Sequence, residues 1–134
     1  MQRESGKSAI DLQKVAGPTL RTLFNIFKEW GLTDRQVRTL LGDIPRQTFH
    51  RWKQDPNKAR ISYDTLERAS YLFGIYKALQ ILLPNISASS GWFYRENTAP
   101  PFGGRPPIER MMAGNVADLY DVRQFLDAAR GVSV

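Results

Sequence analysis

Residues 32–53 read LTDRQVRTLLGDIPRQTFHRWK, and this stretch decides the fold. Thr33, followed three residues later by Gln36, has the form of a capping box, which marks the beginning of a helix. Apolar residues then recur at helical spacing until Gly42, a residue that readily takes the left-handed conformation ending a helix. The first half of the stretch therefore predicts a short, capped helix followed by a glycine turn.

The second half of the stretch predicts another helix, with a basic side. Pro45 suits a first helical turn, where its missing N–H costs nothing. Phe49 and Trp52 are three residues apart and are expected to face inward. The outward positions are then mostly cationic or polar: Arg46, Gln47, His50, Arg51 and Lys53. A helix, a tight glycine turn and a basic second helix resemble a DNA-binding helix-turn-helix.

This motif supplies a candidate set of DNA contacts. Arg and Gln near the start of such a helix are the side chains that hydrogen-bond to guanine and adenine edges, and flanking arginines contact phosphates. The candidates are Arg35, Arg38, Arg46, Gln47, Thr48, His50, Arg51 and Lys53. A solvated charged face on an ordinary helical pair is the alternative interpretation of these residues.

The distribution of charge favours DNA. The chain has 134 residues and a net charge of +6. Residues 1–62 hold 12 Lys/Arg and 6 Asp/Glu, whereas residues 63–134 hold 7 of each. All of the excess positive charge thus lies in the half with the helix-turn-helix, which indicates a polyanionic partner for that half and a different partner for the other.

Several functional classes find no support in the sequence. There is no cysteine and only one histidine, His50, so neither a disulfide framework nor a cysteine- or histidine-built metal site is expected. No catalytic or nucleotide-binding motif is present, and we predict no enzyme activity and no cofactor. The apolar runs are too short to span a bilayer and no secretory signal is visible, so the chain is expected to be cytoplasmic, without a membrane partner.

The rest of the chain predicts an all-α protein in three parts. Residues 1–17 are expected to form a flexible arm, residues 18–62 the helix-turn-helix region, and residues 63–134 a second helical region. Ser62 is expected to cap a long helix, and Gly74 inside that helix indicates close packing by another helix or a second subunit. The predicted inward stripe of this helix is Leu66, Ala69, Phe73, Tyr76, Leu79 and Leu83. Residues 85–107 predict an irregular, ordered loop with packed aromatic residues.

The order of motifs in the second half resembles the toxin-binding domain of the Xre/MbcA/ParS antitoxins. The long helix ends near LLPN and is followed by GWFYREN, then PFGGRPPIERMMAG, then DLYDVRQFLDAARG. Family members have a Trp after the long helix, a Gly and a Pro before a short helix, a Gly after it, and a final helix that ends in Gly. The corresponding residues are Trp92, Gly104, Pro107, Gly114 and Gly131. The segment LLGDIPRQTFHRWK is similar to the Xre-type helix-turn-helix of the same family. The long proline-rich segment 97–107 departs from the family pattern.

This resemblance implies an antitoxin of a type II toxin–antitoxin system. The usual partner is a RES-domain toxin that consumes NAD, and the antitoxin, acting as a dimer, covers the toxin's active site with its C-terminal region. The implied toxin-binding residues are Asp121, Arg123, Gln124, Asp127, Arg130 and Val134. The resemblance also implies operator DNA as a second partner, for autorepression.

Two other functions stay open at this point. The chain could be a stand-alone helix-turn-helix regulator whose C-terminal half only mediates dimerisation. Asp118, Asp121 and Asp127 along the last helix leave room for a small enzyme, although acidic residues near a helix start commonly interact with its dipole.

Overall fold

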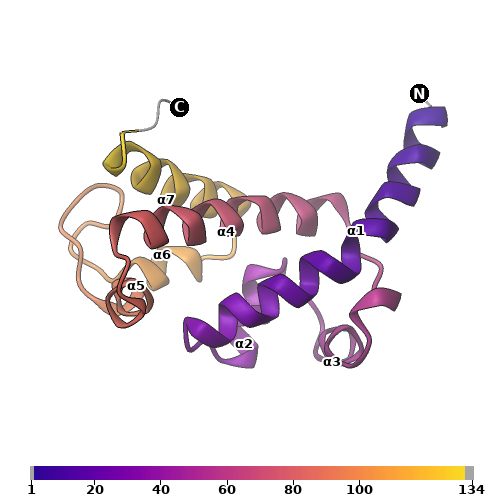
Figure 1. Ribbon diagram of the computed structural model, residues 1–134, viewed down its shortest axis with the longest axis horizontal. Coiled ribbons are helices and arrows are strands. Elements are labelled where there is room, and N and C mark those ends of the chain that lie inside the picture. The colour runs from indigo at the N-terminus through magenta and orange to yellow at the C-terminus, as the bar shows by residue number, and fades with distance from the viewer. Residues whose placement is uncertain (1, 132–134) are drawn as a thin grey trace.

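The computed structural model of the chain describes residues 2–131, with side-chain positions from residue 12 onward. Over residues 2–131 it contains seven α-helices and two short 3-10 turns, with no β-strand (Figure 1). The prediction of an all-α fold is therefore confirmed.

The first helix is longer than the sequence predicted. α1 spans Gln2–Glu29 and has Pro18 in its interior, so it includes residues for which a flexible arm was expected. Figure 1 shows the first turns of α1 leaving the body of the protein at an angle to the rest, as expected when a proline removes a helical hydrogen bond. From Ala16 onward, one side of the helix is buried through Ala16, Leu20, Leu23, Ile26 and Phe27.

The helix-turn-helix follows the sequence prediction closely. α2 spans Asp34–Leu40 and α3 spans Arg46–Gln54, with a short 3-10 turn, η1, at Pro56–Lys58. Thr33 caps α2 and both hydrogen bonds of its capping box with Gln36 are formed. Pro45 is the N-cap of α3 and lies just before the helix instead of in its first turn.

The turn between α2 and α3 contains two successive residues in the left-handed region. Gly42 has a φ of 111° and Asp43 a φ of 62°. Glycine takes this conformation without a steric cost, whereas a residue with a side chain takes it only when its surroundings hold it there.

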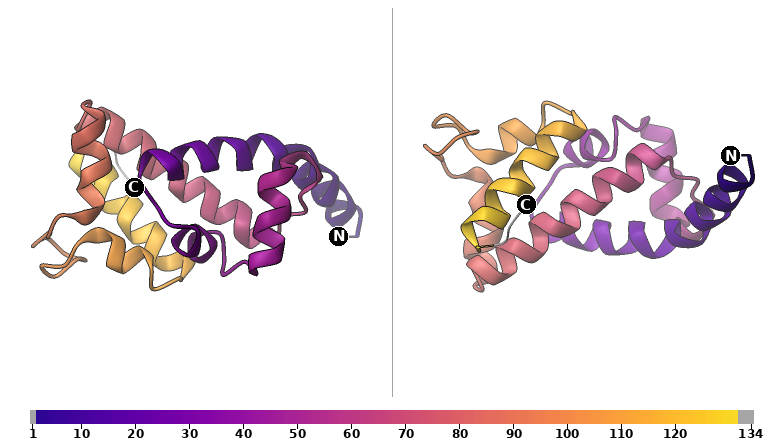
Figure 2. Two further views of the ribbon diagram at one scale, coloured as in Figure 1. Left: turned by 90° about the horizontal axis from the view of Figure 1, so that it is seen from below. Right: turned by 90° about the horizontal axis from the view of Figure 1, so that it is seen from above.

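The long helix α4, Tyr63–Leu82, lies between the two halves of the molecule. Ser62 caps it, as predicted. The predicted inward stripe is only partly right: Ala69 and Leu79 are buried, but most of the buried positions fall elsewhere on the helix, namely Thr65, Arg68, Leu72, Ile75 and Ala78. The reason is that α4 packs against α1 and α7 at once, so it is buried on more than one side (Figures 1 and 2).

The C-terminal half wraps around the far end of α4. The segment predicted as an irregular loop begins with a helix, α5 (Ile86–Gly91), and a 3-10 turn, η2 (Trp92–Tyr94). Phe93 and Phe102 are buried, which confirms that aromatic residues of this segment pack onto the core. The chain then forms α6, Pro107–Met111, and α7, Val116–Ala129. α7 runs alongside α4, shown in yellow above α4 in Figure 1.

Gly74 lies where a side chain of α7 crosses α4. A Cβ at this position would lie 2.7 Å from Cδ of Arg123, which is far inside van der Waals contact. The partner that the sequence predicted at Gly74 is therefore another helix of the same chain.

Candidate functional site

The helix α3 presents one apolar and one basic side. Phe49 and Trp52 are buried, and the ring of Phe49 packs edge-on against Phe24 of α1 with 6.0 Å between centroids. Because these two residues turn inward, most of the polar side chains of α3 are left in solvent. The exposed side chains are Arg46, Gln47, His50, Arg51 and Lys53, whereas Thr48 is half-buried.

Two of the predicted DNA contacts are engaged within the protein. Nε of Arg38 donates a 3.0 Å hydrogen bond to the carbonyl oxygen of Ile44, so this arginine closes the α2–α3 turn instead of projecting into solvent. Lys53 lies 3.8 Å from the carboxylate of Asp34 and over the ring of Phe49. By contrast, Arg35 on α2 is exposed.

Further cations lie beyond the end of α3. A hollow of about 440 Å³ separates α3 from η1 and the segment that follows it, and Arg51, Lys58 and Arg60 line it together with the buried Trp52. Arg51 also donates a 3.3 Å hydrogen bond to the hydroxyl of Thr48. The positive surface therefore continues from α3 onto Lys58 and Arg60.

The predicted toxin-binding residues on α7 fall into two groups. Asp127 is buried, and its carboxylate lies 3.5 Å from Nε of Arg123. Arg123 in turn crosses Gly74 and contacts the carbonyl oxygen of Ser70 at 3.4 Å. Asp127 is therefore buried and Arg123 half-buried, because α4 approaches α7 on this side as well as along its apolar stripe.

The other predicted residues of α7 that the structure describes are half-buried. Asp121 is half-buried and accepts a 2.7 Å hydrogen bond from Arg110 of α6. Gln124 contacts the hydroxyl of Tyr120, and Arg130 is half-buried at the end of the helix. Val134 lies outside the described residues.

Two tyrosines meet on the surface shared by α4 and α7, a contact that was not predicted from the sequence. The rings of Tyr71 and Tyr120 meet edge-to-face at 5.5 Å, and Tyr63 is 58% exposed on the same helix as Tyr71. A hydrogen bond from Tyr71 to Glu67, together with loss of hydration, raises the pKa of the Tyr71 phenol, so this group is neutral near pH 7. Residues 63, 67 and 71 are four residues apart, so the sequence does place them on one side of a helix. The contact with Tyr120, however, depends on α7 lying alongside α4.

Other kinds of site find no support in the part of the chain that the structure describes. No group of three or more His, Cys, Asp or Glu side chains is placed to bind a metal ion there. Within the same residues, no helix combines the length and apolar character needed to cross a membrane.

Comparison with known proteins identifies both halves of the chain. Residues 13–74 match the antitoxin Xre-like helix-turn-helix domain, and residues 78–131 match the antitoxin Xre/MbcA/ParS C-terminal toxin-binding domain. The chain is also 39% identical over 113 residues to the uncharacterized protein y4oB of Sinorhizobium fredii, an alignment that covers 84% of each protein. The two matched segments meet inside α4, so a single helix serves both.

Proposed function

Because the chain belongs to the family of antitoxins that join an Xre-like helix-turn-helix to an Xre/MbcA/ParS toxin-binding domain, we propose that it neutralises a RES-domain, NAD-consuming toxin and represses its own operon. A toxin-binding domain implies a cognate toxin, and an antitoxin acts by binding and not by catalysis. The observation that carries the proposal is the presence of both domains in one chain, with excess positive charge in the helix-turn-helix half alone.

For the toxin, the proposed mechanism is steric. The C-terminal region covers the toxin's active-site cleft and excludes its substrate, so no bond is made or broken by the antitoxin. Gln124 in the middle of α7 and Arg130 directly after the helix are both partly exposed, which supports this assignment together with the tail that ends in Val134. Arg123 and Asp127 serve mainly to hold α7 on α4, so their contribution to toxin binding is indirect.

Rescue of cells that express the toxin tests this assignment. Removal of residues 131–134 combined with Arg130→Ala leaves the packed face of α7 intact, and we expect it to abolish protection. The matched control is Arg95→Ala, which removes the same charge from an exposed residue that bonds to the carbonyl of Ala88. Full protection by the truncated variant would exclude the end of α7 from the toxin contact.

For DNA, we propose that the exposed face of α3 lies in the major groove. Arg46 and Gln47 are in the first turn of the helix, where they reach base edges, while Arg51 and Arg35 contact phosphates. A single helix of this kind reads only a few base pairs, so specific binding requires a homodimer, or a larger complex with the toxin, on paired half-sites.

Salt-dependent binding to the DNA upstream of the chain's own gene tests this second assignment. The double variant Arg46→Ala and Arg51→Ala loses one base contact and one phosphate contact and should bind more weakly. Its affinity should also fall less steeply with salt, because a lost phosphate contact removes about one unit from the slope. The control double variant, Arg95→Ala with Arg105→Ala, makes the same change in net charge at exposed residues of the other half. An equal loss of affinity in both would show that net charge alone is responsible.

A further inference from the structure

We propose that Arg68 is a positioning residue that couples the toxin-binding half of the protein to the orientation of the DNA-reading helix α3. The inference rests on the proposed function for its biological meaning. The physical connection itself is argued from the contacts of the buried Arg68 guanidinium.

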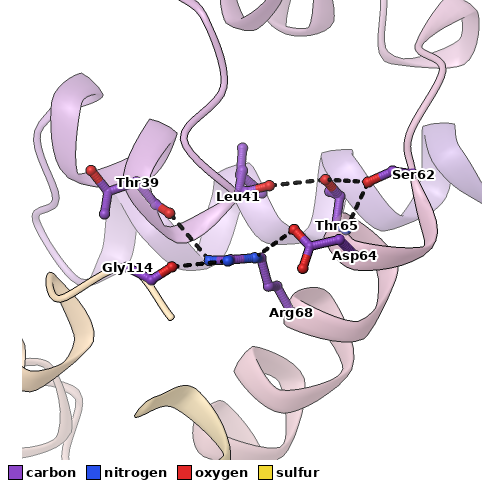
Figure 3. Close-up of polar contacts among 7 residues, drawn as sticks. All are labelled: Thr39, Leu41, Ser62, Asp64, Thr65, Arg68 and Gly114. Carbon is purple, nitrogen blue, oxygen red and sulfur yellow. Dashed lines mark hydrogen bonds and ion pairs between the residues drawn. The ribbon is translucent and has the colours of Figure 1, made fainter. Parts of the chain in front are cut away.

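Arg68 joins three separate segments. Its side chain extends from α4, where only 8% of the residue is exposed, and Nε bonds to the carboxylate of Asp64 at 2.8 Å (Figure 3). Nη2 donates a 2.9 Å hydrogen bond to the carbonyl oxygen of Gly114, between α6 and α7. Nη1 points to the carbonyl oxygen of Thr39, in the last turn of α2, at 3.5 Å. One planar group therefore contacts both matched domains.

The segment beside this guanidinium is the turn that sets the direction of α3. A Cβ on Gly42 would lie 2.9 Å from the Asp64 carboxylate and 3.4 Å from Nε of Arg68, so the pair packs directly against the turn. Thr65, on the same helix, donates a 2.9 Å hydrogen bond to the carbonyl oxygen of Leu41. The left-handed residues Gly42 and Asp43 are thus held from α4, and α4 is held to the α6–α7 turn through Arg68.

This arrangement gives the two sites a physical connection. A toxin that binds α7 and shifts its first turn also moves the carbonyl of Gly114. Because the Arg68 guanidinium contacts both this carbonyl and that of Thr39, the shift is transferred to the end of α2. A lysine at position 68 would keep the charge but has a single nitrogen, which cannot bridge two carbonyls and a carboxylate in one plane. The guanidinium shape, and not only its charge, is therefore what the coupling needs.

Hydrogen–deuterium exchange on the full-length protein tests the proposal without requiring an operator sequence. Amides of residues 41–54 are followed with and without the toxin encoded beside the gene. In the unaltered protein, toxin binding should change their exchange rates by about fivefold or more, in the range of allosteric coupling factors. In Arg68→Lys the change should fall to about twofold or less, although the toxin still binds.

Two further variants make the result decisive. Asp64→Asn keeps Arg68 in place but loosens its orientation, and should give an intermediate response. The side chain of Asp64 is 52% exposed, so folding should tolerate the change. Arg95→Lys is the control: the same substitution is made at an arginine that bonds only to the carbonyl of Ala88, within its own half. In this variant, toxin binding should change the exchange rates of residues 41–54 as much as in the unaltered protein.

The outcomes separate this inference from the proposed function. If the toxin binds and Arg68→Lys transmits its full effect to residues 41–54, Arg68 does not couple the halves. If toxin binding leaves these amides unchanged in the unaltered protein, the coupling itself is absent, while the antitoxin assignment stands. If the toxin does not bind at all, the proposed partner is wrong and the coupling proposal fails with it.

Discussion

The hydroxyl of Tyr94 donates a 2.7 Å hydrogen bond to the carbonyl oxygen of Trp30, and so joins the toxin-binding half to the end of α1. Next to this bond, the rings of Trp30 and Phe93 lie 4.4 Å apart between centroids. The contacts between the two halves therefore include this bond as well as those of Arg68.

Replacement of Tyr94 by Phe should lower the free energy of unfolding by about 1 kcal/mol, the usual net value of one hydrogen bond. Burial raises the pKa of the Tyr94 phenol above its ordinary value of 10.0. The neutral phenol is thus favoured in the folded state, and its contribution to stability is complete below pH 10 and is lost as the pH rises from there towards the raised pKa. Urea unfolding at pH 7 and pH 10.5 measures both effects.

Tyr63→Phe serves as the control for this prediction, because its side chain is 58% exposed. It should leave stability nearly unchanged at either pH. A Tyr94→Phe protein as stable as the unaltered one at pH 7 would show that water replaces the bond to Trp30 at no cost.

Replacement of Gly74 by Ala tests the packing of α7 on α4. Alanine is favoured over glycine inside a helix by about 1 kcal/mol, but here its Cβ must displace the side chain of Arg123 and weaken the pair with Asp127. We expect Gly74→Ala to be neutral or destabilising alone, and stabilising by about 1 kcal/mol in an Arg123→Ala background. A double-mutant cycle of thermal or urea unfolding measures this coupling; additive effects would contradict it.

Arg38→Lys should reduce folding stability by about 1 kcal/mol, because the lysine loses the directed hydrogen bond to Ile44 that closes the α2–α3 turn. The neighbouring exposed arginine gives a matched comparison: Arg35→Lys should leave stability unchanged. For Arg35→Ala, the expected loss is in DNA affinity and in its salt dependence. If Arg38→Lys is as stable as Arg35→Lys, the turn does not depend on that bond.

Asp127→Ala should destabilise the protein by about 1–2 kcal/mol, since it removes a buried carboxylate and leaves Arg123 without its ion pair. Gln124→Ala, three residues earlier and half-buried, should have little effect on unfolding but should weaken the toxin complex. Urea unfolding and a toxin pull-down on the two variants distinguish these roles. Loss of toxin binding by Asp127→Ala without loss of stability would place Asp127 in the interface after all.

The sequence alone determined the features that depend on neighbouring residues. The capping box at Thr33, the cap at Ser62 and the glycine turn at Gly42 all formed as predicted. So did the burial of Phe49 and Trp52, because helical spacing fixes which residues share a side. These local rules were enough to predict the all-α fold and the exposed basic face of α3.

Only the tertiary structure decided what the polar residues do. Arg68 bonds to carbonyls 29 and 46 residues away, and Arg123 reaches a carbonyl 53 residues away. The same applies to α4, whose burial on several sides depends on two helices that are distant in sequence. The sequence around a charged residue is the same whether its side chain lies in solvent or against another helix. Its role is fixed only when the packing brings that helix alongside.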